Sequence, residues 1–139
     1  GGRRERTMSG LRRKRIDGGY REGYLKSAAW WARRRRFLKG RPEIRCECLG
    51  EQLTERTAQV HHVAYDGVTE GEDGSWQADE ADEDLMVLCA WCHERVHQLM
   101  DRDRGWSGTS RRAATTAIVR TIQRRVLVEA VRLSREGEK

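Results

Sequence analysis

Residues 84–97 read DLMVLCAWCHERVH, and this stretch decides the fold that we predict. The apolar run at residues 85–88 predicts a short strand, and residues 90 to about 100 predict a helix. Cys89 and Cys92 lie where the strand passes into the helix. A strand-to-helix junction that carries two thiols is typical of a metal-binding turn, so we expect a small α+β domain.

A second strand is predicted upstream, at residues 57–65, where the sequence TAQVHHVAY is rich in β-prone residues. Residues 66–83 follow it and contain three glycines and eight acidic residues, with no lysine or arginine. This composition predicts a loop. Its length exceeds the usual range for a connection without structure of its own.

Helices are predicted on both sides of these strands. Ser27 is a suitable N-cap for a helix over about residues 28–39, which Gly40 would end. We interpret Trp30 and Trp31 of this helix as core anchors, with base stacking as the alternative.

The last helix is predicted over about residues 110–135, and residues 1–18 have no apolar periodicity. The apolar stripe of the last helix consists of Ile118, Ile122, Val126, Ala130 and Leu133. We therefore expect three segments: a flexible basic arm at 1–18, a central domain at 19–108 and a C-terminal basic helix at 109–139.

The four cysteines predict one structural zinc site. Cys46 and Cys48 form a CxC pair, Cys89 and Cys92 form a CxxC pair, and no cysteine is left over. Four thiolates around one Zn²⁺ make a closed tetrahedral site, which adds folding energy to a domain with a small core. Disulfides and free buried thiols are the alternatives, although nothing in the sequence indicates an oxidising compartment.

The four histidines predict a second metal site. His93 and His97 are spaced i and i+4 and share one helix face, roughly 90° from the direction of the two cysteines on that helix. His61 and His62 lie on the upstream strand. Neutral imidazoles bind transition metals, and one that is left unligated can act as a base near pH 7. In a regular strand these two neighbours point to opposite faces, so both serve one site only if the strand bulges or ends there.

Composition and charge exclude some classes and favour a polyanionic partner. Among 139 residues, 37% are hydrophobic and 36% are charged, and no apolar stretch is long enough for a membrane span, so we expect neither a membrane nor a secreted protein. Residues 1–45 and 109–139 hold 24 of the 28 lysines and arginines, whereas residues 46–108 hold 15 of the 22 acidic residues. Arginine-rich ends suit phosphate contacts, although simple solvated faces or a GC-rich coding sequence would give the same count.

Four segments together resemble the HNH endonucleases: YLKSAAWWARRRRFLKG, RCECLG, VHHV and DLMVLCAWCHERVH. They span roughly residues 24–97. The resemblance implies a ββα-metal core, also called the His-Me finger, with flanking N-terminal and C-terminal helices.

The resemblance also implies a role for each matching residue. His62 resembles the general base, His61 the preceding metal ligand and His93 the last catalytic histidine, also a ligand. His97 resembles a further ligand of the colicin-type branch, and Asp84 falls at the position of the middle Asn. The structural zinc ligands of the zinc-containing branch correspond to Cys46, Cys48, Cys89 and Cys92.

Two departures from the family pattern matter: the first cysteine pair is CxC instead of CxxC, and Asp84 replaces Asn. An Asn amide both donates and accepts hydrogen bonds, whereas an ionised Asp only accepts.

The implied activity is metal-dependent hydrolysis of DNA phosphodiester bonds that leaves 5′-phosphate and 3′-hydroxyl ends. The catalytic ion would be Mg²⁺, Mn²⁺, Zn²⁺ or Ni²⁺, and an all-histidine set favours the last three. We expect double-stranded DNA as the partner, bound through phosphate contacts by Arg33, Arg34, Arg35, Arg36, Arg120 and Arg124. A small HNH chain with basic flanks is typical of a phage-encoded nuclease in the bacterial cytoplasm, where it would assist packaging proteins or act as a free-standing or restriction-type nuclease.

Two other classes compete with this interpretation. A non-catalytic zinc-ribbon DNA-binding module would use the cysteines and leave the four histidines without a role. An RNA-directed nuclease or toxin is the other alternative.

Overall fold

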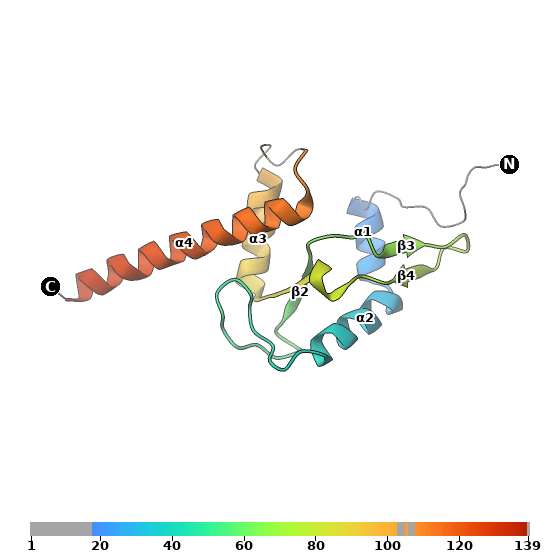
Figure 1. The fold of residues 1–139 in the computed structure, drawn as a ribbon, viewed down its shortest axis with the longest axis horizontal. Coiled ribbons are helices and arrows are strands. Elements are labelled where there is room, and N and C mark those ends of the chain that lie inside the picture. The colour runs from blue at the N-terminus through green and yellow to red at the C-terminus, as the bar shows by residue number, and fades with distance from the viewer. Residues whose placement is uncertain (1–17, 103–104, 106–107, 139) are drawn as a thin grey trace. The chain divides into compact units, whose positions relative to one another are not determined.

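The computed structural model describes residues 18–102, 105 and 108–138. The predicted basic arm lies outside this range apart from Gly18. The described residues form an α+β fold, as predicted, with four α-helices and two small antiparallel sheets (Figure 1). In chain order the elements are α1 (Gly18–Leu25), α2 (Ala28–Lys39), β2 (Gln59–His62), β3 (Val68–Glu70), β4 (Trp76–Ala78), the 3-10 helix η1 (Asp82–Asp84), β5 (Leu85–Leu88), α3 (Ala90–Arg102) and α4 (Arg111–Gly137). One sheet consists of β2 and β5, and the other consists of β3 and β4.

The described residues divide into two compact units. The first contains the chain up to Pro42 together with Ala64–Met86. The second contains Glu43–Val63 together with the chain from Val87 onward. All four cysteines and all four histidines belong to the second unit.

The first unit contains a hairpin that the sequence did not predict. Within residues 66–83, where we expected a loop, β3 pairs with β4 in the register Val68–Ala78 and Glu70–Trp76. Each strand is only three residues long, so no alternation of apolar and polar residues marks it in the sequence. Gly67 is required where the two strands diverge from the hairpin, because a Cβ there would lie 2.3 Å from the Asp79 carbonyl oxygen.

Helix α2 begins as predicted, but only one of its two predicted core tryptophans is buried. The Ser27 hydroxyl accepts a hydrogen bond from the Trp30 amide at 3.1 Å and so caps the helix. Trp30 is buried with Phe37, seven residues later, which confirms it as a core anchor. Trp31 is 49% exposed and carries the Arg34 guanidinium over its ring, so its prediction as a core anchor is wrong. Trp30 and Phe37 lie on one face of the helix, and Trp31 points about 100° away from that face, toward solvent.

A buried polar cluster fastens α2 within the first unit. Arg33 donates from Nε and Nη2 to the carbonyl oxygen of Glu80, at 3.0 and 2.8 Å, and pairs with Asp82. The Tyr24 hydroxyl of α1 donates to the Glu80 carboxylate at 2.6 Å. Burial, strengthened by this carboxylate, raises the pKa of Tyr24, so the hydroxyl stays protonated and continues to donate.

The second unit packs α3 against both β2 and α4. Its apolar core includes Val60 from β2, Val96 from α3 and Ile118 and Ile122 from α4. The Ser110 hydroxyl caps α4 by accepting a hydrogen bond from the Ala113 amide at 3.1 Å.

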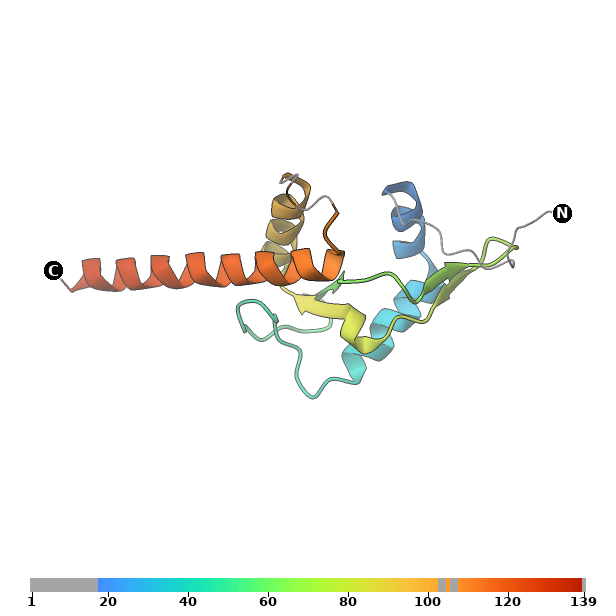
Figure 2. The same ribbon diagram turned by 45° about the horizontal axis from the view of Figure 1, so that its top comes forward.

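Only the first half of the predicted stripe on α4 is buried. Ile118 and Ile122 are 2% exposed, whereas Val126 and Leu133 are 37% and 54% exposed. Figures 1 and 2 both show the C-terminal half of α4 continuing past α3, with no other element of the second unit beside it.

None of the helices in the described part of the chain has the length and apolar character needed to cross a bilayer.

Candidate metal centres

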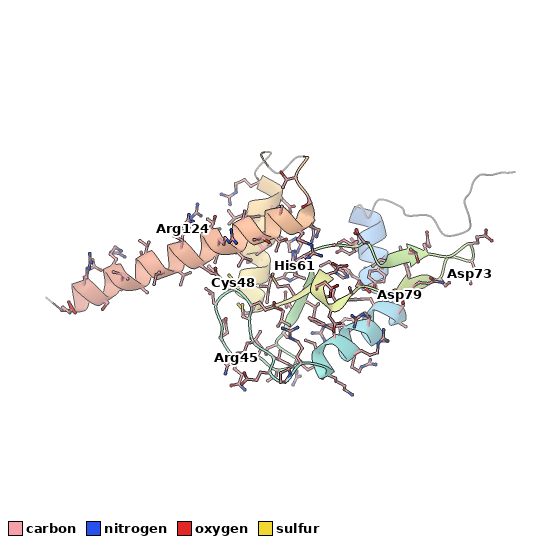
Figure 3. All side chains as sticks on the ribbon, in the orientation of Figure 1. Arg45, Cys48, His61, Asp73, Asp79 and Arg124 are labelled. Carbon is pink, nitrogen blue, oxygen red and sulfur yellow. The ribbon has the colours of Figure 1, made fainter. Side chains whose placement is uncertain are left out.

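Three imidazoles from two elements converge in the second unit. His61 comes from β2, and His93 and His97 come from one face of α3. One nitrogen from each ring lies within 4.8 Å of the others. The ring centroids of His93 and His97 are 4.6 Å apart, and the His61 centroid is 5.4 and 5.3 Å from them. Figure 3 labels His61, which is 1% exposed. These three side chains could hold one metal ion.

Hydrogen bonds to neighbouring side chains fix two of these rings. The Gln59 amide oxygen lies 2.6 Å from Nδ1 of His93, and the Thr115 hydroxyl lies 3.0 Å from Nε2 of His61. Among the described residues, Nδ1 of His61 is buried without a hydrogen-bond partner. A buried nitrogen without a partner is costly in a structural histidine, whereas a metal ligand requires it.

The remaining nitrogens have the spacing of ligands. Nε2 of His93 and Nε2 of His97 are 3.0 Å apart. Two nitrogens bound to one metal at about 2.0–2.1 Å lie about 2.9–3.4 Å apart in octahedral or tetrahedral geometry. The donor set, its outer hydrogen bonds and the spacing therefore fit a transition-metal ion.

The site holds the imidazoles of His61 and His93 in the neutral form, which is the form that binds metals. Burial, with added repulsion from the Arg111 guanidinium, lowers the pKa of His61 to about 2. Burial, with repulsion from His97 and Arg111, lowers the pKa of His93 to about 4. Both rings are therefore uncharged at neutral pH.

His62 belongs to the same strand but not to the three-imidazole group. It is buried, and its carbonyl oxygen accepts a hydrogen bond from Nε of Arg111 at 2.6 Å. Gln59 and His61 lie on the face of β2 that meets α3, and successive residues of a strand point to opposite faces. The two neighbouring histidines therefore have different environments, as their spacing predicts.

The cysteines gather in a second cluster in the same unit. The thiols of Cys46, Cys89 and Cys92 lie within 4.8 Å of one another, and all three are buried. The four cysteines are free thiols, and this cluster could hold a metal ion. Cys48 is buried too, but its Sγ lies 4.0 Å from the Val119 carbonyl oxygen and outside this group of three.

The backbone around the thiols has the form of a metal-binding turn. The Leu49 amide lies 3.5 Å from Sγ of Cys46, and the Cys92 amide lies 3.4 Å from Sγ of Cys89. Gly50 has φ of +88°, which lets the chain turn back immediately after the CxC pair. Burial strongly raises the pKa of Cys92, so a cation is needed to hold its thiolate at neutral pH.

Helix α4 contributes residues that sequence reasoning missed. Arg111 and Thr115 are four residues apart on its first turns and contact His62 and His61. The N-cap serine at 110 marks where this helix starts, but nothing in the sequence shows that it starts beside β2. The role of Gln59 beside the imidazoles could have been predicted from the sequence. Gln59 precedes His61 by two residues, so the two side chains lie on the same face of the strand.

Comparison of the chain with family models, with curated proteins and with solved structures finds no match.

The other predicted site residues lie in different settings. Asp84 ends η1 in the first unit and is half-buried. We expected six arginines to bind DNA. One of them, Arg33, is only 8% exposed and its guanidinium is hydrogen-bonded within the fold, so it is not free to contact a phosphate. The exposed members of this set are Arg35, Arg36, Arg120 and Arg124, the last of which is labelled in Figure 3, and Arg34 is half-buried.

Proposed function

We propose that the chain is a metal-dependent endonuclease of the HNH type that hydrolyses phosphodiester bonds in double-stranded DNA. The observation that carries this proposal is the group of three imidazoles, His61, His93 and His97, in which Nδ1 of His61 is buried without a hydrogen-bond partner among the described residues. The order of β2, β5 and α3 supports it, because the proposed ββα-metal core has two strands followed by a helix. His61 precedes His62 on the first strand, and His93 begins the histidine face of the helix.

In this proposal His61, through Nδ1, and His93 and His97, through Nε2, would hold the catalytic ion. When bound, the ion supplies Lewis-acid stabilisation of the charge that develops on the phosphate and on the leaving 3′ oxygen. Thr115 and Gln59 keep the rings of His61 and His93 in the ligand orientation.

His62 acts as the general base. Its ring removes a proton from the water that attacks phosphorus. The new P–O bond forms as the bond to the 3′ oxygen breaks, and the leaving oxygen takes a proton from solvent to become the 3′-hydroxyl end. Arg111 fixes the backbone of His62 through its carbonyl oxygen and places a positive charge near the phosphate site. His62 is outside the group of three possible ligands, so its imidazole would stay available to accept a proton.

The cysteine cluster is structural in this proposal. A zinc ion on Cys46, Cys89 and Cys92, with Cys48 as fourth ligand, would fasten the turn after Arg45 to the start of α3. Hydrogen bonds already join this turn to β5, since Glu47 donates to the Val87 carbonyl oxygen and accepts from its amide at 2.8 and 2.7 Å. The zinc would thus hold α3, and with it the two α3 imidazoles, in place.

DNA would be held by the arginines that stay exposed, Arg35 and Arg36 on α2 and Arg120 and Arg124 on α4, with Arg34 beside them. Phosphate contacts of this kind give affinity without sequence preference. A phage-encoded nuclease that acts in the bacterial cytoplasm beside packaging proteins is the biological setting that we propose.

A zinc-ribbon DNA-binding module remains the second candidate, and the thiol cluster favours it. The deciding experiment is plasmid cleavage after removal of loosely bound metal, with Mg²⁺, Mn²⁺, Zn²⁺ or Ni²⁺ added back and zinc content measured in parallel. We expect cleavage with at least one ion, inhibition by EDTA, and recovery on re-addition. Asp101→Asn, an exposed change on α3, serves as the control variant and should cleave normally. DNA binding without cleavage under every ion would overturn the nuclease proposal and favour the zinc ribbon.

A further inference from the structure

The apolar stripe of α4 continues beyond the part that the second unit covers. Val119 and Ile122 are buried. At 100° per residue, Val126, Ala130 and Leu133 lie within an arc of about 60° that continues the direction of these two residues. Val126 and Leu133 nevertheless remain open to solvent, with 37% and 54% of their surface exposed. A helix of this kind stabilises its apolar face by packing, so the open half needs a partner.

One edge of this open stripe carries alternating charges. Arg125, Glu129, Arg132 and Glu136 follow one another along it, and within the helix Arg132 pairs with both glutamates. A surface that alternates in sign in this way is complementary to itself when two copies run in opposite directions. Arg120 and Arg124 lie away from this edge, on the other side of the stripe.

We infer that the open stripe is covered by the same stripe of a second copy of this chain, with the two α4 helices antiparallel. The two-fold axis would pass between Glu129 and Ala130. Val126 then meets Leu133 of the second copy, and Leu133 meets its Val126, so one contact occurs twice. The small side chain of Ala130 allows the helices to approach closely at the centre.

The charges favour the antiparallel direction. About that axis, Glu129 is level with Ala130 of the second copy, and Arg132 of the second copy lies two residues, or about 3 Å, further along. Likewise, Glu136 of the second copy lies two residues, or about 3 Å, beyond the position level with Arg125. In a parallel pair the charged edge would instead face the side of the helix that carries Gln123 and Leu127, which offers these charges no partner in the second copy.

A groove between α3 and α4 extends the same surface. It has a volume of about 200 Å³, and its walls include Trp91, Arg95, Arg125 and Val126. Trp91 is 54% exposed. In the antiparallel pair the last turn of the second copy's α4 reaches this groove, where its Glu136 carboxylate faces two guanidinium groups. The groove can therefore receive the end of α4 from the second copy, which is the same partner that would cover the apolar stripe.

Sedimentation of the full chain over a concentration series, without DNA, tests this inference. We expect a reversible monomer–dimer equilibrium, because a contact of this size is at the small end for stable interfaces. Leu133→Glu should weaken dimerisation at least 10-fold. Val128→Glu is the matched control: Val128 is 61% exposed on the same helix but lies about 200° from Val126, so it should leave the dimer intact. A chain that stays monomeric at every concentration, or equal effects of the two variants, would overturn the inference.

A charge exchange tests the direction of the pair. Glu129→Arg alone should weaken dimerisation, and the double variant Glu129→Arg, Arg132→Glu should restore most of it, because both chains then carry exchanged partners. Absence of recovery would overturn the antiparallel arrangement. Circular dichroism and zinc content confirm that each variant is folded, and since neither measurement uses cleavage, this result is separate from the outcome for the nuclease proposal.

Discussion

The two nitrogens of the His61 ring differ in what surrounds them, and this difference assigns their roles. Nε2 is held by Thr115 at 3.0 Å, whereas Nδ1 is buried and finds no hydrogen-bond partner in the part of the chain that the structure describes. Loss of the hydroxyl would free the ring to rotate and would remove the partner that fixes its tautomer. Outer hydrogen bonds of this type typically change metal affinity by about 10- to 100-fold.

Thr115→Val should therefore weaken binding of the catalytic ion about 10- to 100-fold while the protein stays folded, since valine has nearly the same shape. Isothermal titration with Mn²⁺ or Ni²⁺ measures the effect. Thr116→Val is the control, because Thr116 is exposed on the next position of α4. Equal metal affinity in both variants would remove Thr115 from the site.

The different environments of His62 and His93 predict different defects. General-base assistance is worth about 10²–10⁴-fold in rate, so His62→Ala should lose activity to this extent while it keeps metal affinity, structural zinc and DNA binding. His93→Ala should lose activity together with affinity for the catalytic ion. Plasmid cleavage and metal titration of both variants check this pair. Cleavage at the wild-type rate by His62→Ala would show that another group is the base.

At the scale of the elements, helix α2 carries neighbouring arginines with opposite roles. Arg33 bonds the Glu80 carbonyl oxygen, whereas Arg36 is exposed. Arg33→Ala should lower the free energy of unfolding by about 2 kcal/mol, because it leaves that carbonyl oxygen without its charged donor. Arg36→Ala should leave stability unchanged and weaken DNA binding. Urea unfolding and a DNA-binding titration of both variants distinguish the roles, and equal stability of the two would contradict the one given to Arg33.

The thiols of Cys46, Cys89 and Cys92 lie within 4.8 Å of one another, so a zinc ion held there would join the turn at residues 46–48 to the start of α3, and its removal should loosen both. We expect about one tightly held zinc per chain and loss of cooperative thermal unfolding when a strong chelator removes it. Cys92→Ser should abolish zinc retention. Cys48→Ser decides whether the fourth thiol is a ligand: retained zinc with unchanged affinity would show that another group completes the site. Folded protein without zinc would contradict the prediction.

The elements also show what the sequence could predict. Helix α2, strand β5 and helices α3 and α4 follow from capping residues and apolar periodicity, and the metal clusters follow from the spacing of Cys89, Cys92, His93 and His97. The β3–β4 hairpin was not predicted because its strands are too short to show a periodic pattern. Helix α1 was not predicted because it contains few apolar residues. The role of Thr115 depends on where α4 packs, which is a tertiary property that no local pattern encodes.

At the scale of the whole molecule, acidic and basic residues concentrate in different parts of the sequence. The acidic residues concentrate in residues 46–108, which hold the cysteines and histidines, whereas 24 of the 28 basic residues lie before or after this stretch. A cation site gains from nearby acidic charge, and a polyanion gains from the basic ends. The segments proposed to position a metal and those proposed to bind a phosphate backbone are thus distinct in the sequence.

Affinity for DNA should therefore fall steeply as salt rises. A protein that makes 6–10 phosphate contacts loses about 10³–10⁵ in affinity between 50 and 200 mM salt, because each contact releases condensed counterions. Residues 1–17 hold seven of the lysines and arginines, and their replacement by glutamine should reduce the slope of log affinity against log salt by up to about 6. The same replacement should leave zinc content unchanged, because every cysteine lies downstream of it. Fluorescence anisotropy with duplexes of two unrelated sequences measures the slope and the sequence preference together. An affinity that hardly changes over this salt range would show that phosphate contacts do not hold the DNA, and the basic ends would then need another partner.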